Sequence, residues 1–152
     1  MSAAGAGLRE RGGAIHASLT VWCRRGILIL GAAGGGKTAL CLELMTAGAY
    51  LVADDLVRLE PRGGVLHASA AGATGLIELR GNGIFRVAAS DGVRVSLCVE
   101  LQAWSVQERL PETSVIRLAG VDVPLLRLPA GGVVRAGALL LALHAGGAGE
   151  WQ

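Results

Sequence analysis

The chain has 152 residues, which is enough for one domain with a substantial core, and its formal net charge of +2 comes from scattered arginines rather than a basic stripe. This pattern argues against a nucleic-acid partner, and the longest apolar runs fall far short of the roughly 20 residues that a membrane span needs. Three widely spaced cysteines without a C-x-x-C pair indicate neither a disulfide framework nor a zinc site, so we expect a cytoplasmic protein.

Strand and turn signals alternate through the first half of the chain. We expect a flexible tail over residues 1–13, a strand over 15–22, a turn at 24–26 and a second strand over 27–30. A helix over 37–47 should follow, ended by Gly48, because four apolar residues recur at helical spacing. They are Leu40, Cys41, Leu44 and Met45.

Further strands are expected in the second half. The apolar run at 50–53 continues through 56–59 to a turn at 61–64, and short strands are predicted at 76–79, 84–88 and 93–101. A loose helical period predicts a last helix over about 131–144. We therefore expect one domain over residues 14–145, with a second flexible tail over 146–152.

The sequence of residues 31–38 matches the phosphate-binding pattern G-x-x-x-x-G-K-[ST] in full. Its lysine is the single lysine among 14 basic residues, and arginine's planar fork would not replace that compact ammonium beside a phosphate. Glycines let backbone N–H groups turn toward an anion, and a helix start adds partial positive charge. The residues expected to bind the nucleotide are Gly31, Ala32, Ala33, Gly34, Gly35, Gly36, Lys37 and Thr38. Lys37 would neutralise the β- and γ-phosphates, and the Thr38 hydroxyl would coordinate Mg²⁺.

Two adjacent acids, Asp54 and Asp55, follow the apolar run at 50–53, where ligands bind in open α/β sheets. One of them could act as a general base toward an attacking hydroxyl. Neighbours in a regular strand point to opposite faces, so both carboxylates can serve one site only if the strand ends there. A polar strand end before a turn is the alternative, and it is stronger for Asp54 than for Asp55.

Three more residues could contribute. His16, on the strand before the loop, could orient a group or accept a proton, although a single histidine beside an apolar stretch is more often structural. Glu78 could reach Mg²⁺ directly or through water, and Arg80 could reach a phosphate. The alternative for Glu78 and Arg80 is a surface ion pair.

In combination, these motifs resemble the catalytic domain of HPr kinase/phosphorylase. His16, the loop at 31–38, the L-V-A-D-D tract at 51–55 and the E-x-R-G-x-G-I signature at 78–84 follow in the order and approximate spacing of that family. The resemblance runs from about residue 15 to 110 and more weakly to 143. The chain resembles a short form reduced to the kinase domain, without the separate N-terminal domain of longer members.

The resemblance implies an enzyme that uses ATP and Mg²⁺ to phosphorylate a serine on the phosphocarrier protein HPr of the phosphotransferase system. It implies that Asp55 accepts the proton of that serine, and donates one if inorganic phosphate attacks phosphoserine in reverse; whether this chain retains the reverse reaction stays open. His16, Lys37 and Arg109 match active-site positions of the family, and Thr38 and Glu78 match its magnesium ligands. Signature, phosphate or partner contacts are assigned to Asp54, Arg80, Gly81 and Gly83.

The implied fold is of the α/β class. It is a P-loop domain similar to the nucleotide site of phosphoenolpyruvate carboxykinase, with a β-rich core and few helices. The resemblance also implies a homo-oligomer, because many members of the family form hexamers.

Two alternatives remain from the residues themselves. A small-molecule P-loop kinase would also carry an aspartate about one helix and one strand after the lysine, but the E-x-R-G-x-G-I run counts against it. A non-catalytic ATP-binding sensor would lack a working base, and the intact set of Lys37, Thr38, Asp55 and Glu78 counts against that.

Overall fold

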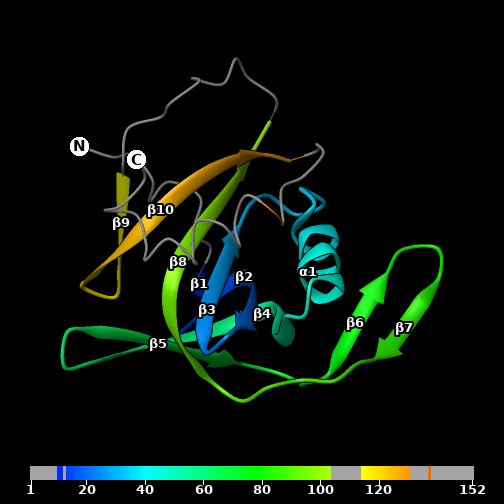
Figure 1. Cartoon of the computed structure of the whole chain (residues 1–152), viewed down its shortest axis with the longest axis horizontal. Coiled ribbons are helices and arrows are strands. Elements are labelled where there is room, and N and C mark those ends of the chain that lie inside the picture. The colour runs from blue at the N-terminus through cyan, green and yellow to red at the C-terminus, as the bar shows by residue number, and fades with distance from the viewer. Residues whose placement is uncertain (1–9, 12, 104–113, 131–136, 138–152) are drawn as a thin grey trace.

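The computed structural model describes residues 10, 11, 13–103, 114–130 and 137 (Figure 1). Strands dominate this part of the chain, and one helix covers a sheet, which confirms the predicted α/β class with a β-rich core. In chain order the elements are β1 (Glu10–Arg11), β2 (Ala14–Trp22), β3 (Arg25–Leu30), α1 (Lys37–Thr46), β4 (Tyr50–Arg62), β5 (Val65–Ala70), β6 (Leu76–Leu79), β7 (Gly83–Arg86), β8 (Val93–Gln102), β9 (Ser114–Leu118) and β10 (Val121–Pro129).

The main sheet is 8-stranded, and part of it closes on itself. β2 pairs with both β3 and β4, β4 pairs with β5, β5 pairs with the start of β8, and β8 pairs with β3. β10 and β9 extend this ring from the second half of β8. A closed ring of strands shields its backbone groups and encloses a core, which gives the site a rigid support.

Alternation of side chains along the strands builds two hydrophobic cores. One lies within the ring and contains Ala17, Leu19, Leu28, Val57 and Cys98. The other lies beneath α1. Here Leu40, Cys41 and Leu44 of the helix meet Ile27, Ile29, Leu51, Leu97 and Val99 of the sheet. The predicted apolar stripe of the helix is thus confirmed as the face that packs on the sheet.

The strands predicted at 15–22, 27–30, 50–59, 76–79 and 93–101 are confirmed, and the one predicted at 84–88 is β7. Four strands were not predicted, namely β1, β5, β9 and β10. Proline has no N–H to donate to a sheet, and Pro124 is accommodated in β10 because it lies where that strand pairs with β9, before pairing with β8 begins at Leu125. The expected tail boundary at residue 13 was wrong, because Glu10–Arg11 already pairs with β2. The 146–152 tail, and all of the predicted last helix except Gly137, lie outside the described residues.

A separate hairpin, β6–β7, projects beside α1 (Figure 1). Ile77 of β6 is buried in the core beneath the helix and anchors the hairpin there. Every residue of β7 is exposed. Within the described ranges, no helix is long and apolar enough to cross a membrane.

Thr20 presents an unpaired hydroxyl in the core beneath α1. It is 0 % exposed, and its Oγ1 has no hydrogen-bond partner among the described residues. Its cross-strand neighbours, Ile27 and Leu51, are both apolar and buried. An unsatisfied buried hydroxyl reduces the stability of a fold.

We therefore expect Thr20→Val to raise the free energy of unfolding by about 1 kcal/mol, because valine has a similar shape and no polar atom. Urea unfolding followed by circular dichroism measures the change. Thr20→Ser is the matched control, since it keeps the hydroxyl and loses the methyl group, and it should lower stability. Equal or lower stability of the valine variant would contradict this account of the core.

Candidate active site

The loop between β3 and α1 carries the phosphate-binding sequence. Its backbone turns tightly: the N–H of Gly35 donates to the carbonyl of Ala32 at 2.8 Å, and a Cβ at Gly35 would lie 2.7 Å from that same oxygen. Glycine is therefore required at this position. No side chain caps the start of α1 at Gly36. The first N–H groups of the helix are thus available to an anion, as the sequence predicts.

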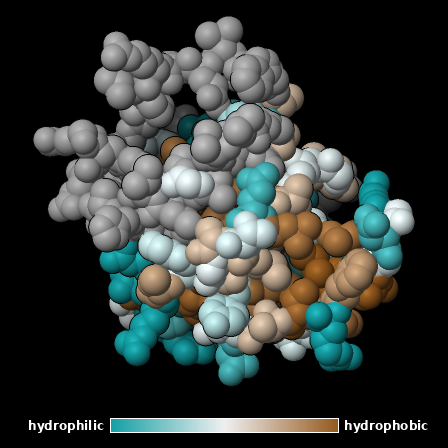
Figure 2. Space-filling model, turned by 45° about the vertical axis from the view of Figure 1, so that its right-hand side comes forward, coloured by the Kyte–Doolittle hydropathy of each residue, from teal (hydrophilic) through white to brown (hydrophobic). Residues whose placement is uncertain are grey.

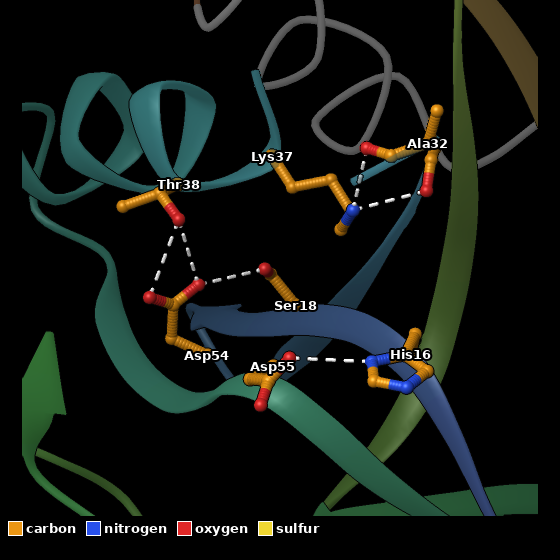
Figure 3. Close-up of polar contacts among 8 residues, drawn as sticks. His16, Ser18, Ala32, Lys37, Thr38, Asp54 and Asp55 are labelled. Atoms are coloured by element: carbon orange, nitrogen blue, oxygen red, sulfur yellow. Dashed lines mark hydrogen bonds and ion pairs between the residues drawn. The ribbon is translucent and has the colours of Figure 1, made fainter. Parts of the chain in front are cut away.

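Lys37 lies folded over this loop. Its Nζ donates to the carbonyl oxygens of Gly31 and Ala32, each at 2.9 Å (Figure 3). Burial lowers the pKa of Lys37, and the nearby carboxylates of Asp54 and Asp55 act in the opposite direction. The ammonium group therefore lies within the loop and close to both acids that the sequence singled out.

The Asp54 carboxylate, on β4, accepts hydrogen bonds from hydroxyl groups of two other elements, α1 and β2. The Thr38 Oγ1, at the start of α1, donates to the carboxylate, with distances of 3.1 and 3.3 Å to its two oxygens. The Ser18 Oγ, on β2, donates to Oδ1 at 2.9 Å (Figure 3). Sequence reasoning missed Ser18. The only signal was its place two residues after His16, on the same face of a strand.

Asp55 lies next to His16. The His16 Nδ1 and the Asp55 Oδ1 are 3.2 Å apart, and the Asp55 side chain is 74 % exposed. An ionised carboxylate only accepts hydrogen bonds, so in this pair the ring donates from Nδ1. The exposed carboxylate is held in place on one side and open to an incoming group on the other.

The condition derived for a regular strand, that both acids can serve one site only if the strand ends there, does not apply to β4. The strand continues to Arg62, and the two carboxylates reach one site through an irregular backbone. Asp55 has φ +116°, a conformation that non-glycine residues rarely adopt. Its register partner Ala17 is buried inside the ring, yet the Asp55 carboxylate turns to the neighbouring His16. Strained backbone of this kind is concentrated at functional sites.

The signature residues lie on the β6–β7 hairpin. Glu78 and Arg80 are exposed, and neither side chain makes a hydrogen bond or ion pair with a described residue. Gly81 and Gly83 form the tip of the β6–β7 hairpin. Arg109 lies outside the described residues. The roles assigned to these residues by resemblance stay predictions.

The residues present fit Mg²⁺ bound with a nucleotide. The Thr38 hydroxyl and the Asp54 carboxylate supply hard oxygen donors at the loop, and Mg²⁺ takes one or two protein ligands with phosphates and water completing its shell. No group of three acidic, histidine or cysteine side chains that could hold a metal alone exists among the described residues. This donor set suits a metal that arrives with its nucleotide.

Fold and site together define an α/β domain in which a glycine-rich loop ending in Lys-Thr joins a strand to a helix. Residues 10–140 match the family model described as "HPr Serine kinase C-terminal domain". The chain belongs to this family.

Curated relatives agree with this assignment. The chain is 37% identical over 128 residues to the HPr kinase/phosphorylase of Chlorobium luteolum, covering 75% of this chain and 39% of the relative. It is 35% identical over 129 residues to that of Halalkalibacterium halodurans, covering 76% of this chain and 42% of the relative. The chain thus spans about two fifths of the length of these relatives.

A solved structure shows the same fold. The Hpr(Ser) kinase/phosphatase from Coxiella burnetii superposes with a TM-score of 0.70 at 28% sequence identity, over 84% of this chain and 90% of the other. The strand-rich architecture is therefore shared with that protein.

The strained backbone at Asp55 yields a test with two variants. Asp55→Ala and Asp55→Gly both remove the carboxylate, but glycine tolerates a positive φ. Glycine in a regular strand would be the less stable choice. We expect the reverse here, with the glycine variant about 1 kcal/mol more stable than the alanine variant in urea unfolding. A more stable alanine variant would contradict the strained geometry.

Proposed function

We propose that the protein is an ATP- and Mg²⁺-dependent kinase that transfers the γ-phosphoryl group to a serine of an HPr-type phosphocarrier protein. Family membership supports the class of reaction. The main support is that the two adjacent acids have different partners. The Asp54 carboxylate accepts a hydrogen bond from the Thr38 hydroxyl, and Asp55 is exposed beside His16. One acid serves the metal side of the site and the other serves proton transfer.

Asp55 is the proposed base. It accepts the hydrogen of the attacking serine hydroxyl as that oxygen bonds to the γ-phosphorus and the bond to the ADP leaving group breaks. The His16 Nδ1–H holds the carboxylate by its other oxygen and limits its rotation. Because 74 % of the Asp55 side chain is exposed, a serine on another protein can approach it.

Lys37 and the loop are the proposed phosphate site. The ammonium group exchanges its bonds to the carbonyls of Gly31 and Ala32 for phosphate oxygens, which carry full negative charge. Backbone N–H groups at the start of α1 add hydrogen bonds. Bound Mg²⁺ would be held by Thr38, with Asp54 bonded to the same hydroxyl, and would neutralise charge that develops on the phosphates.

We further propose the other features that the resemblance implies. The nucleotide site is similar to that of phosphoenolpyruvate carboxykinase, Glu78 is a second magnesium ligand and Arg109 is a catalytic arginine. The protein is cytoplasmic and forms a homo-oligomer such as a hexamer.

The reverse reaction with inorganic phosphate is tested by incubating the phosphoserine product with phosphate and measuring pyrophosphate.

The β6–β7 hairpin is the proposed contact for the protein substrate. Ile84 is 69 % exposed and Phe85 is 44 % exposed, both on β7. Figure 2 shows hydrophobic surface gathered on the side of the molecule that carries α1 and the hairpin. Arg80 and Arg86 are also exposed on the hairpin. An exposed apolar surface with cationic neighbours suits a protein partner better than a small molecule.

Phosphate transfer is the direct test. The purified protein is incubated with ATP, Mg²⁺ and the HPr-type protein of the same organism, and phosphoserine is mapped by mass spectrometry. Asp55→Asn should lower the rate by about a hundredfold or more, because general-base catalysis contributes on that scale. Asp91→Asn, the same change in the segment between β7 and β8, is the matched control and should retain the wild-type rate.

Three other outcomes are informative. Transfer that survives in Asp55→Asn would remove Asp55 from the role of base. ATP turnover without protein phosphorylation would point to a small-molecule acceptor. ATP binding without any turnover would point to a nucleotide sensor.

Substitution on the hairpin tests the protein contact. Phe85→Ser should raise KM for the phosphocarrier by roughly fivefold or more and leave KM for ATP unchanged, because a buried aromatic contact would be lost only with the protein substrate. Val115→Ser is the matched control, since Val115 is 51 % exposed on β9. An unchanged KM for the phosphocarrier in Phe85→Ser would exclude this contact.

A further inference from the structure

β2 carries two buried hydroxyl groups on one face, and they differ in their surroundings. Ser18 is 1 % exposed and donates to Asp54, whereas Thr20 is 0 % exposed and has no partner among the described residues. Both are register neighbours of β4: Ser18 lies opposite Asp54, and Thr20 lies opposite Leu51. The two hydroxyls have the same degree of burial, so burial alone does not explain the contact with Asp54.

The hydrogen bond from Ser18 to Asp54 indicates a specific role for Ser18. A hydroxyl has one hydrogen, and that of Ser18 is committed to Asp54 Oδ1 at 2.9 Å. The same carboxylate accepts the Thr38 hydroxyl at 3.1 and 3.3 Å. A carboxylate fixed by Ser18 therefore fixes the direction of the Thr38 hydrogen. The lone pairs of the Thr38 oxygen are then left for another ligand.

The other residues around Asp54 are consistent with a fixed position of its carboxylate. Burial, with a smaller contribution from Asp54, raises the pKa of the Cys41 thiol to about 12, so it stays uncharged next to Ser18. Lys37 lies on the loop side, bonded to carbonyl oxygens. Among the hydrogen bonds of the described residues, the Asp54 carboxylate is held only by the hydroxyls of Ser18 and Thr38.

We propose that Ser18 is a positioning residue: by anchoring Asp54 it orients the Thr38 hydroxyl so that its oxygen faces the metal of a bound metal–nucleotide complex. The proposal rests on the proposed function, because it concerns the same nucleotide site. It assigns Ser18 a role that acts through Asp54, without contact to nucleotide or substrate. Groups that orient metal ligands in this way typically affect metal affinity by one or two orders of magnitude.

The test measures Mn²⁺ binding to the protein–ADP complex by electron paramagnetic resonance. Ser18→Ala should weaken Mn²⁺ binding by roughly tenfold or more. Thr20→Val, which removes the other buried hydroxyl of the same strand face, is the matched control and should leave Mn²⁺ binding unchanged. Ser18→Cys keeps nearly the same volume with a far weaker donor, so it carries the test if Ser18→Ala does not fold.

A second measurement separates positioning from general stability. In an Asp54→Ala background, Ser18→Ala should have no further effect on Mn²⁺ affinity, because the group through which it acts is gone. A full effect in that background overturns the proposal. So does wild-type Mn²⁺ affinity in a folded Ser18→Ala or Ser18→Cys variant.

The outcome is distinguishable from failure of the proposed function. If the wild-type protein binds Mn²⁺ with ADP but transfers no phosphate to protein, the kinase proposal fails, and the Mn²⁺ affinities still decide the role of Ser18. If the wild-type protein binds no Mn²⁺ with ADP, both proposals are overturned.

Discussion

Backbone conformation at Asp55 determines where each of two adjacent carboxylates lies. In a regular strand Asp54 and Asp55 would project from opposite faces of β4, and the second would enter the core within the ring of strands. With φ +116° at Asp55, its carboxylate instead reaches His16, while Asp54 stays bonded to Thr38. The strain costs on the order of 1–3 kcal/mol, and the ring of strands on either side of β4 maintains it.

The rigid parts of the fold explain why such strain can persist. β2 pairs with β4 along the segment that contains both acids, and β2 also supplies His16 and Ser18. Helix α1 is fixed on the sheet by three buried side chains of its apolar stripe. The side chains that meet the acids therefore come from elements with little freedom to shift, whereas the hairpin with the signature residues is anchored mainly by Ile77.

Much of this architecture can be predicted from the sequence, because its strongest signals are local. The phosphate-binding loop, helix α1 and the first strands each follow from a short motif or a clear period, and the acids were singled out with them. Three features depend on long-range pairing and were missed or misjudged. Strands β5, β9 and β10 are weakly patterned, Ser18 acquires its partner only through the β2–β4 register, and the backbone at Asp55 breaks the alternation that the prediction assumed.

We propose that the two adjacent acids serve the metal and the proton within one site, and a crystal structure of the protein with Mg²⁺ and a non-hydrolysable ATP analogue can show whether they do. We expect a positive φ at Asp55, its carboxylate beside His16 and the γ-phosphate, and Mg²⁺ on Thr38 with Asp54 still bonded to that hydroxyl. A regular strand conformation at Asp55, with its carboxylate turned away from the γ-phosphate, would show that Asp55 is not the base.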